Sequence, residues 1–338
     1  MKAIKINGKY GYDFRYNGKR YRRQGFSRKV DAEAQIRRIV NEASRGVDAT
    51  SNVLLVDYYE RWMIAKKEGR VVQKTWNNYK NVLNLMEDHF GPTKRLKDLN
   101  GIEYQEFINK YAQRHTRETV RKVHNAVNKC LEHAVKDGLI YQNPTWDADI
   151  YGKVPPRPED EKYMEVDEYK ALKHHIKNYS SKSALFIFIL ICTGARFGEV
   201  NQLKYKDLNK NQIHLPGTKT ETSDRNVDIA EKDMAHIKLV LSQHTINLHD
   251  YIFNLSHRAV EKTFKHALRH LNISEDKTLH SLRHTHCSYL LANDVSIYYI
   301  SQRLGHKNIS ITTKVYSHLL KDHYVEDNHK TLILLGGM

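Results

Sequence analysis

The stretch TGARFGEV, residues 193–200, follows the longest apolar run of the chain, residues 184–192. That run is far shorter than the roughly 20 apolar residues needed to cross a bilayer, so it predicts a buried helix. Gly194 should end this helix, which leaves Arg196 near the start of the next one, a favourable place for a phosphate. The planar guanidinium of Arg196 matches phosphate oxygens, and Glu199 either orients it or forms an ordinary structural ion pair with it.

Residues 212–230, QIHLPGTKTETSDRNVDIA, predict a small β-hairpin. Pro216-Gly217 and the polar run at 222–224 flank two short β-like stretches, which places Lys219 near the turn. The lysine ammonium is a compact point charge with a movable proton, suited to protonating a leaving oxygen. Taken alone, Lys219 is an ordinary surface lysine.

Further along the chain, histidine, arginine and tyrosine recur in short motifs. In HSLRH, residues 280–284, His280 and Arg283 are three apart and share one face of a helix. Leu304-Gly305-His306 follows, and ten residues after His306 stands Tyr316, near a predicted helical segment. Because Tyr316 is one of 21 tyrosines, a special role for it rests on this context alone.

Histidine is abundant, with 20 residues, and His284, His286 and Cys287 lie close together in the sequence. No second pair stands at the spacing of a zinc site, and residues 280–291 are predicted to form one helix. Packed or solvated histidines are therefore the favoured interpretation, and no metal is expected. The chain also contains no glycine-rich phosphate loop and no nucleotide-binding fingerprint, so no cofactor is expected.

Residues 1–48 predict a three-stranded antiparallel sheet followed by a helix. Asn7-Gly8 and Asn17-Gly18 are strong signals for two-residue hairpin turns, with aromatic and basic residues around them. Ser27 is expected to cap the helix, and Gly46 to end it. The packed face of this helix is expected to consist of Ile36, Ile39, Val40 and Ala43.

Positive charge is concentrated in this first block. The chain has a formal charge of +16 and a pI near 9.5, which favours a polyanionic partner, nucleic acid or less often an acidic membrane surface. Residues 1–50 carry thirteen Lys/Arg against five Asp/Glu, which is half of that excess. Arg15, Arg20, Arg22 and Arg23 stand among Tyr and Phe, and predict a sheet that binds DNA. A solvated basic face on a small domain is the alternative.

Residues 52–148 predict a compact domain of four helices. Thr75, Asn100 and Thr116 are the expected caps, and Gly91-Pro92 and Gly138 the expected ends. Its buried faces are expected to include Leu83, Met86 and Phe90 on one helix, and Val123, Val127, Leu131 and Ala134 on another. Residues 151–163 are proline-rich and charged, and are typical of a linker to a third block, residues 164–338.

The cysteines and the N-terminus indicate the compartment. Cys130, Cys192 and Cys287 are odd in number, far apart and without a CxxC pair, which favours a reducing cytoplasm over a disulfide framework. The start MKAIKINGKY lacks the apolar core of a signal peptide. We therefore expect a soluble cytoplasmic protein without a membrane partner.

Five motifs occur in order between residues 193 and 319: TGARFGEV, GTKTETSDR, HSLRHTH, LGHKNISIT and VYSHL. This series resembles the tyrosine recombinases of the phage-integrase family, whose signature is an Arg, a hairpin Lys, His-x-x-Arg, Gly-His and a nucleophilic Tyr. Each motif is weak alone, but five in order at compatible gaps are specific. The resemblance covers the whole third block. The helical block resembles the core-site-binding domain of the family by position, and residues 1–48 resemble the arm-binding domain of integrases from phages and conjugative transposons.

The resemblance implies a role for each matching residue. Arg196 and Arg283 would clamp the scissile phosphate, and His306 would complete this anion site. His280 would serve in proton transfer near the nucleophile, and Glu199 would support Arg196. Lys219 would protonate the departing 5′ oxygen, and Tyr316 would attack phosphorus to form a 3′-phosphotyrosyl bond. The gap of ten between His306 and Tyr316, where some relatives have nine, does not disturb this assignment.

The same chemistry is physically coherent. A free tyrosine has a pKa of about 10 and is a poor nucleophile at neutral pH. Two guanidiniums and a histidine would neutralise the phosphodiester and favour a nearby phenolate. The phosphotyrosyl ester would keep the energy of the cut bond, so resealing would need no ATP and no metal.

The implied fold is multidomain and mainly helical, with a small N-terminal sheet and a mixed α/β catalytic domain. The implied partners are double-stranded DNA with core-type and arm-type attachment sites, a homotetramer on synapsed sites, an excisionase and a host DNA-bending protein. A phage or another mobile element would be integrated and excised. Delivery of Tyr316 to its own site or to a neighbour's stays open.

Three other interpretations deserve comparison. A type IB topoisomerase would not need a separate basic module at the N-terminus, and a Xer-type resolvase would lack residues 1–48. A non-catalytic DNA-binding protein on the same fold would be favoured by a missing Tyr, Arg or His, and none is missing.

The C-terminal segment, residues 331–335, is apolar. It is expected to pack on the catalytic domain, in cis or on a neighbouring subunit.

Overall fold

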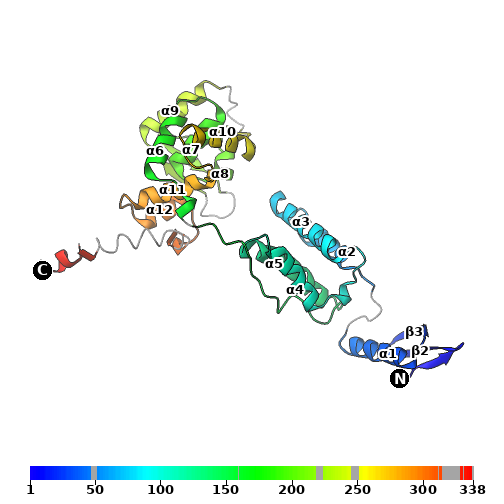
Figure 1. Cartoon of the computed structure of the whole chain (residues 1–338). Coiled ribbons are helices and arrows are strands. Elements are labelled where there is room, and N and C mark those ends of the chain that lie inside the picture. The colour runs from blue at the N-terminus through cyan, green and yellow to red at the C-terminus, as the bar shows by residue number, and fades with distance from the viewer. Residues whose placement is uncertain are drawn as a thin grey trace. The chain divides into compact units, whose positions relative to one another are not determined.

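The computed structural model describes the chain at residues 1–46, 52–158, 160–217, 224–244, 251–310, 312–313, 328–329 and 331–336 (Figure 1). These residues form two compact units, residues 1–156 and residues 157–338.

The first unit starts with a small antiparallel sheet of β1 (Ile4–Ile6), β2 (Lys9–Tyr16) and β3 (Lys19–Phe26), in that order. Both predicted turns are present. Asn7 and Gly8 have φ values of 51° and 82°, and Asn17 and Gly18 have 46° and 77°. Positive φ at both central residues is what a type I′ hairpin turn requires, and Asn-Gly is the pair that adopts it most readily. The predicted three-stranded sheet is confirmed.

Helix α1 (Lys29–Ser44) packs on this sheet. Ile36, Ile39 and Ala43 are buried with Tyr12 and Tyr21, and Val40 is partly buried against them. The predicted packed face of the helix is therefore confirmed.

The predicted cap of α1 is wrong. The helix begins at Lys29 with Arg28 in the capping position, and no side chain accepts a hydrogen bond there. Ser27 lies one residue too early to cap it. The first turn is held instead by an ion pair of 2.9 Å between the Arg28 guanidinium and the Asp31 carboxylate.

The rest of the first unit is helical. Its long elements are α2 (Leu55–Lys67), α3 (Gln73–Phe90), α4 (Gly101–Ala112) and α5 (Arg117–Lys136), with a short 3₁₀ turn at Leu96–Asp98. They enclose one core that includes Met86, Val123, Val127, Leu131 and Ala134, with Leu83 and Phe90 partly buried against it. These are the residues predicted for the buried faces.

Most of the predicted helix boundaries hold. Gly91 follows α3 with φ at 74°, Asn100 and Glu103 cap α4 reciprocally, and the Thr116 side chain accepts from the Thr119 backbone N–H. Thr75 is wrong as a cap, because α3 begins two residues earlier. Its backbone N–H is already inside the first turn and donates to the Val72 carbonyl at 2.8 Å.

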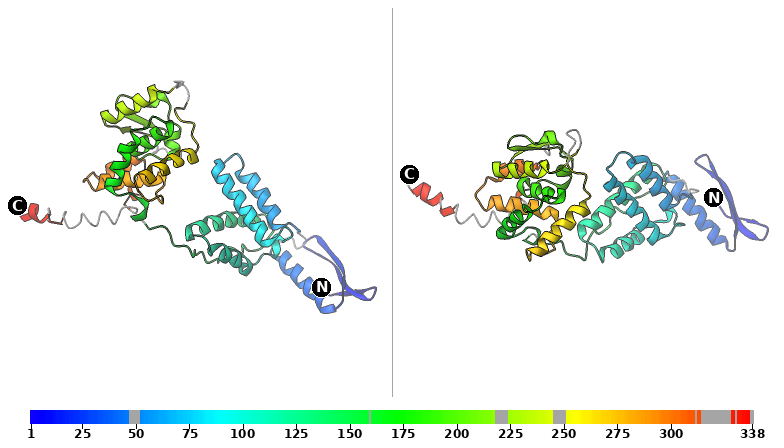
Figure 2. Two further views of the ribbon diagram at one scale, coloured as in Figure 1. Left: turned by 45° about the horizontal axis from the view of Figure 1, so that its top comes forward. Right: turned by 90° about the horizontal axis from the view of Figure 1, so that it is seen from above.

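The second unit surrounds one apolar helix. Helix α7 (Lys182–Thr193) buries every side chain from Ala184 to Thr193, as the run of apolar residues predicts. Against it lie α6 (Val166–Ile176), α8 (Phe197–Asn201), α9 (Glu231–Ser242), α10 (His257–His270) and α11 (Leu279–Leu291), as Figure 2 also shows. A helix that is apolar all round is stable in water only when it is enclosed in this way.

The remaining elements of this unit are a small hairpin and a short helix. Strands β4 (Gln212–Leu215) and β5 (Arg225–Asp228) pair antiparallel, and α12 (Ile297–Leu304) packs on α11 and beside β5. Short 3₁₀ turns stand at Asp160–Lys162 and Tyr205–Asp207. The mainly helical fold with a mixed α/β second unit is confirmed.

Residues 331–336 are helical, and their apolar side chains lie in solvent. Leu332, Ile333, Leu334 and Leu335 are 62–73% exposed. Packing of this segment on the chain's own catalytic unit, one of the two expected alternatives, is therefore wrong. A contact with a neighbouring subunit remains a prediction.

None of the helices in the described ranges combines the length and the apolar character that spanning a bilayer would require.

Gly194 should be essential to the junction between α7 and α8. Its φ is 64°, and a Cβ there would stand 2.8 Å from side-chain carbons of both His286 and Leu304. We expect Gly194→Ala to lower the free energy of unfolding of the second unit by about 2–4 kcal/mol, from left-handed strain plus overpacking. Thermal and urea unfolding of the full chain measure this effect.

The matched control is Gly198→Ala, in α8, where the added Cβ would meet nothing within 4 Å beyond its chain neighbours and the backbone of its own helix. This variant should unfold like the wild type. Equal unfolding temperatures for the two variants would contradict the role given to Gly194.

Candidate active site

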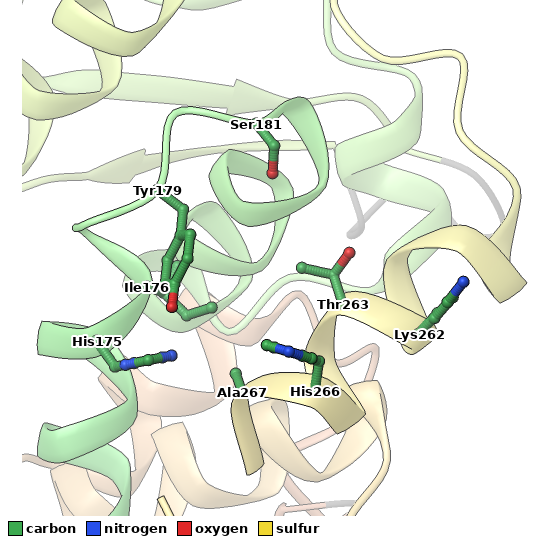
Figure 3. Close-up of a pocket in the computed structure, with 8 residues that line it drawn as sticks. All are labelled: His175, Ile176, Tyr179, Ser181, Lys262, Thr263, His266 and Ala267. Carbon is green, nitrogen blue, oxygen red and sulfur yellow. The ribbon is translucent and has the colours of Figure 1, made fainter. Parts of the chain in front are cut away.

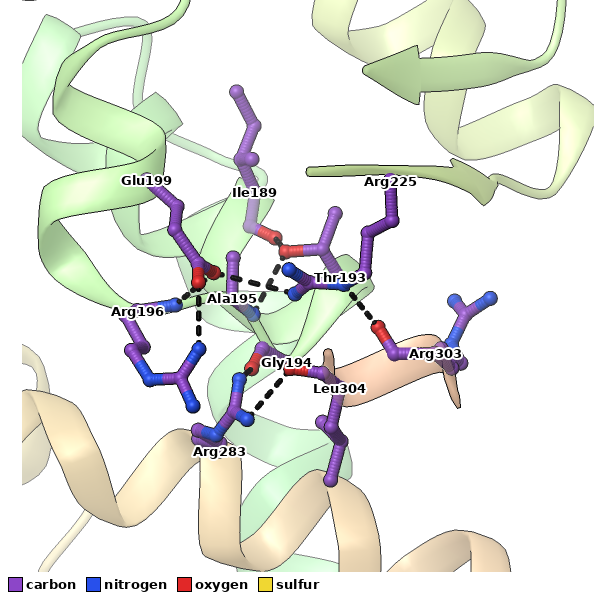
Figure 4. A network of polar contacts seen from close by, with 10 residues as sticks. All are labelled: Ile189, Thr193, Gly194, Ala195, Arg196, Glu199, Arg225, Arg283, Arg303 and Leu304. Carbon is purple, nitrogen blue, oxygen red and sulfur yellow. Dashed lines mark hydrogen bonds and ion pairs between the residues drawn. The ribbon is translucent and has the colours of Figure 1, made fainter. Parts of the chain in front are cut away.

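The junction of α7 and α8 positions Arg196. Gly194 ends α7 in the left-handed conformation, and extended backbone at Arg196 then leads into α8. The Glu199 carboxylate is fully buried and accepts from the Arg196 backbone N–H at 2.8 Å and from its Nη1 at 2.7 Å (Figure 4). About a third of the Arg196 side chain stays exposed. Glu199 therefore orients the guanidinium while part of the side chain remains accessible to solvent.

Arg283, on α11, reaches the same place from the other side. The whole residue is only 4% exposed. Its guanidinium donates to the Gly194 carbonyl at 2.9 Å and to the Leu304 carbonyl at 2.6 Å. Arg196 and Arg283 both lie close enough to His280 and His306 to lower the pKa of each, and Figure 4 draws the two arginines with their partners. One buried side chain thus joins the ends of α7 and α12, beside the junction that carries Arg196.

His306 follows α12 directly, after Gly305 ends that helix in the left-handed conformation. Its Nδ1 lies 2.7 Å from the buried Thr312 hydroxyl. Burial, followed by the charges of Arg283 and Arg196, lowers the pKa of His306 to about 3. The ring is therefore neutral at pH 7, and when Thr312 donates to Nδ1 the ring proton lies on Nε2, ready to donate to an anion.

His280 lies one helical turn before Arg283 and packs edge-on against His284, with ring centroids 4.9 Å apart. Close packing, then Arg283 and Arg196, lowers the pKa of His280, although part of the residue faces solvent. A neutral imidazole with an open edge can accept a proton. Arg196, Arg283, His280 and His306 thus form one electrostatic cluster, built from segments far apart in the sequence.

Two of the residues predicted for catalysis lie outside the described residues. Lys219 belongs to residues 218–223, which connect β4 to β5, and Tyr316 belongs to residues 314–327. The hairpin that should carry Lys219 is confirmed on both sides, with Leu215 paired to Arg225. The roles of Lys219 and Tyr316 stay predictions.

Arg225 and Arg303 complete the cluster and were not predicted from the sequence (Figure 4). Arg225 Nη2 lies 3.2 Å from Glu199 Oε2, and Arg225 Nε donates to the Arg303 carbonyl at 2.6 Å. The Arg303 guanidinium donates to the Cys192 carbonyl at 2.9 Å. One signal was available in the sequence: strand alternation places Arg225 on the same face as Val227, which is buried.

The balance of charge around Glu199 follows from these contacts. Burial alone would raise the pKa of Glu199, but Arg225 and Arg196 hold it below its ordinary value. The carboxylate is therefore ionised, and it is shared between two guanidiniums.

The four arginines predicted to bind DNA divide between the two faces of the N-terminal sheet. Cross-strand pairing of Arg15 with Arg20, and of Arg22 with Asp13, puts three of them on one face. Asp13 bonds to Arg20 at 2.6 Å and lies 3.9 Å from Arg22, so this face keeps an excess of positive charge. Arg23 is on the other face, over the ring of Phe26.

Two family models match the chain. The Phage integrase family matches residues 162–323, and the N-terminal SAM-like domain of phage integrases matches residues 54–112. The chain belongs to the tyrosine recombinases of the integrase type. The first match includes the whole cluster of arginines and histidines around Arg196 and Arg283, and it also includes Lys219 and Tyr316.

Two curated relatives are aligned with this recombinase over most of their length, and both are named as recombinases or integrases. A tyrosine recombinase XerC-like protein of Caldanaerobacter subterraneus subsp. tengcongensis is 25% identical, with 90% of each chain covered. The prophage ps2 probable integrase of Lactococcus lactis subsp. lactis is also 25% identical, with 81% of each chain covered.

Among solved structures, this recombinase is similar to lambda integrase. The lambda integrase dimer bound to a COC′ core site matches with a TM-score of 0.66 and 18% identity, over 92% of this chain and 93% of that one. The lambda integrase tetramer bound to a Holliday junction matches with a TM-score of 0.62 over the same shares. At this identity the likeness establishes the fold.

The histidines and cysteine considered for zinc have other partners in the recombinase. His286 is buried; its Nδ1 lies 3.0 Å from the Ile191 carbonyl, and its Nε2 accepts from Arg303 Nε at 3.1 Å. Burial, followed by Arg303, lowers the pKa of His286 to about 3. Within the described ranges, no three His, Cys, Asp or Glu side chains are grouped closely enough to hold a metal ion.

A separate cavity of about 240 Å³ lies between α6 and α10 (Figure 3). Among its lining residues are His175, Tyr179, Lys262 and His266. None of the residues predicted for catalysis lines it.

His214 on β4 joins two carboxylates at the base of the hairpin. Its Nε2 lies 2.9 Å from Asp224 and its Nδ1 lies 3.2 Å from Asp207. Asp224, and then Asp207, raise the pKa of His214 above 6.5. In its protonated form, His214 therefore joins Asp224, at the start of the β5 side of the hairpin, to Asp207 in the 3₁₀ turn before β4.

This ion pair predicts a pH dependence of stability. A raised folded-state pKa means that His214 stabilises the fold fully below pH 6.5, and that this contribution is lost as the pH rises through the folded-state value. The difference in unfolding temperature between wild type and His214→Gln should therefore shrink as the pH rises above 6.5.

The control is His236→Gln. Burial, followed by Lys177, lowers the pKa of His236, which packs on Phe188, so its contribution is lost as the pH falls below 6.5. The two variants should show opposite slopes. A difference for His214→Gln that does not vary with pH would show that the imidazolium is not formed.

Proposed function

We propose that this recombinase cuts and rejoins DNA through a covalent bond between Tyr316 and a 3′ phosphate. The observation that carries the proposal is the convergence of Arg196 and Arg283, with His280 and His306, at one junction of α7, α8, α11 and α12. Arg196 is about one-third exposed and oriented by the Glu199 carboxylate, and Arg283 is buried. Planar guanidiniums match the oxygens of a DNA phosphodiester, which would bind to both.

Each residue would act on a named atom. The Tyr316 oxygen would form a bond to phosphorus while the bond from phosphorus to the 5′ oxygen breaks. The phenol proton would pass to His280, and Lys219 would give a proton to the departing 5′ oxygen. Arg196 and Arg283 would hold the non-bridging oxygens, and His306 would donate from Nε2 to one of them as their charge grows.

Rejoining would run the same steps in reverse. A 5′ hydroxyl of the partner strand would attack the phosphotyrosyl ester, and the Tyr316 phenol would leave with a proton. One phosphodiester bond is broken and one is formed in each full exchange. No external energy source enters, because the ester keeps the energy of the cleaved bond.

The domains would divide the work of DNA binding. We assign residues 52–148 to core-type sites, residues 1–48 to arm-type sites, residues 151–163 to the linker, and residues 164–338 to catalysis. A groove between α3 and α5 supports the first assignment, since Lys74, Lys122 and Lys129 line it together with Asn78 and Asn125. Lysine suits phosphates, and asparagine can read base edges.

The assembly would be a homotetramer on synapsed sites. The exposed apolar side chains at residues 332–335 support a contact with a neighbouring subunit, because such a patch is costly in water. The lambda integrase tetramer on a Holliday junction has the same fold. An excisionase and a host DNA-bending protein would set the direction of the reaction.

Tyr316→Phe should abolish cleavage, because the variant lacks the attacking oxygen. Incubation with a nicked suicide substrate that carries the attachment site should give a covalent protein–DNA band with the wild type and none with the variant. DNA affinity, measured by gel shift, should stay near the wild-type value, since a single oxygen contributes little contact. Covalent complexes formed by the variant would refute the assignment of Tyr316.

Removal of the N-terminal block should separate the two kinds of DNA binding. A chain that starts at Ser51 should keep cleavage of core-type sites but lose arm-type binding and efficient integration. In the full chain, Arg15→Ala combined with Arg22→Ala should weaken arm-site binding and reduce its steep dependence on salt. Arg23→Ala, on the opposite face, is the matched control and should have a smaller effect.

A Xer-type resolvase is the alternative, and it predicts a different result. Residues 1–48 would then be a nonspecific basic anchor, which binds arm-type and random DNA equally well. Footprints without a protected arm sequence would favour this alternative.

A further inference from the structure

We propose that Arg225 is a positioning residue for strand cleavage: it balances the charge of Glu199, so that Arg196 keeps its own positive charge for the scissile phosphate. This inference rests on the proposed role of Arg196 as a phosphate ligand. It assigns a function to a residue that stands outside the Arg, Lys, His-x-x-Arg, Gly-His and Tyr signature of the family.

The contacts of Arg225 point to an indirect role. Its side chain is only 8% exposed, and its Nη2 is 3.2 Å from Glu199 Oε2. The same carboxylate oxygen accepts from the Arg196 backbone N–H, and the other oxygen accepts from the Arg196 guanidinium. Figure 4 shows the Glu199 carboxylate bonded to Arg196 on one side and to Arg225 on the other.

Charge balance explains why a second arginine is needed. Glu199 is fully buried, and its ionised carboxylate would be costly with a single partner. If Arg196 were that only partner, the pair would be neutral and would attract a phosphate weakly. With Arg225 present, two guanidiniums share one carboxylate, and one positive charge is left over. The Coulomb interaction of that charge with a phosphate is strong in a partly dry site.

A second contact links Arg225 to His306. Arg225 Nε donates to the Arg303 carbonyl, and Arg283 donates to the next carbonyl, that of Leu304. Two arginines thus bind consecutive carbonyls at the C-terminal end of α12, immediately before Gly305 and His306. Cations at these free carbonyls stabilise a helix end, and a planar fork can serve Glu199 and a carbonyl together.

The position of Arg225 also connects the site to the lysine hairpin. It is the first residue of β5, two residues after the segment that contains Lys219. Loss of Arg225 could therefore slow cleavage in two ways, through Arg196 or through Lys219. We propose that the effect passes through Arg196. A methylphosphonate substrate and a 5′-bridging sulfur substrate distinguish this from an effect through Lys219.

The test measures the rate of covalent complex formation by the full-length protein on a suicide substrate, under saturating protein. Arg225→Gln should lower this rate by roughly 10–100-fold, as do changes in groups that orient the ligands of a metal site. Arg225→Lys should recover only part of the rate, because an ammonium cannot bond to Glu199 and the Arg303 carbonyl as a planar fork does. Arg269→Ala, an exposed arginine on α10, is the matched control and should match the wild type.

A substrate with a neutral scissile group distinguishes an electrostatic role of Arg225 from a merely structural one, through the ratio of wild-type to Arg225→Gln cleavage rates. When a methylphosphonate replaces the scissile phosphate, one negative charge is absent and less positive charge is needed. The ratio of wild-type to Arg225→Gln rates should then fall close to one. A ratio that stays as large as on normal DNA would overturn the proposal and indicate a structural defect.

Two further measurements complete the design. Glu199→Gln should reduce the effect of Arg225→Gln in a double-mutant cycle, since no buried charge is then left to balance; independent effects would refute the link. A substrate with a 5′-bridging sulfur needs no proton from Lys219, so full rescue of Arg225→Gln by sulfur would also overturn the proposal. If the wild type itself forms no covalent complex, the proposed function fails, whereas a normal wild type with an equally fast Arg225→Gln refutes only this inference.

Discussion

The second unit depends on one interaction, the pair of hydrogen bonds that the buried Arg283 guanidinium donates to two helix ends. This guanidinium binds the Gly194 carbonyl at the end of α7 and the Leu304 carbonyl at the end of α12. The last carbonyls of a helix have no partner within the helix, so an arginine between two such ends satisfies both. The residue proposed to hold the phosphate is therefore also the residue that fixes the distance between the Arg196 junction and His306.

Positive charge gathers around this arrangement. The guanidiniums of Arg196 and Arg225 share the buried Glu199 carboxylate, and Arg283 and Arg196 both act on His306. Like charges in a partly dry place are unfavourable in the free protein, and the same field lowers the pKa of His306. A bound phosphodiester would relieve both effects, so DNA binding and the charge state of the site should be linked. Perturbed pKa values of this kind are common at functional sites.

The first unit has a different balance of charge, on which the proposed binding of DNA would depend. The arginines of the N-terminal sheet are exposed, and one carboxylate, Asp13, is shared between Arg20 and Arg22. Exposed charges of this kind give affinity that depends strongly on salt, but little sequence information. The groove between α3 and α5 adds asparagines to its lysines, which suits the reading of bases.

The amino-acid sequence by itself determined the elements and the chemistry. Asn-Gly pairs at residues 7–8 and 17–18 specify type I′ turns, because few other residues adopt positive φ twice in succession. The apolar run at residues 184–192 could only be a buried helix, since every face of it avoids water. The predicted caps at Ser27 and Thr75 were wrong, because α1 and α3 both begin without a side-chain cap, at Lys29 and Gln73. The order of Arg, His and Tyr motifs indicated the family before any coordinates.

Only the tertiary structure decided which residues support the site and how they share charge. Strand alternation could have indicated that Arg225 is buried, but not that it bonds to Glu199. The contacts of Arg225 with Glu199 and of Arg303 with Cys192 join separate segments and leave no periodic signal. The structure also separated Arg23 from Arg15 and Arg22, because strand register sends alternate side chains to opposite faces. Composition can count the charges of a protein, but the energy of each charge depends on its distance from the others and from water. Those distances exist only once the chain has folded.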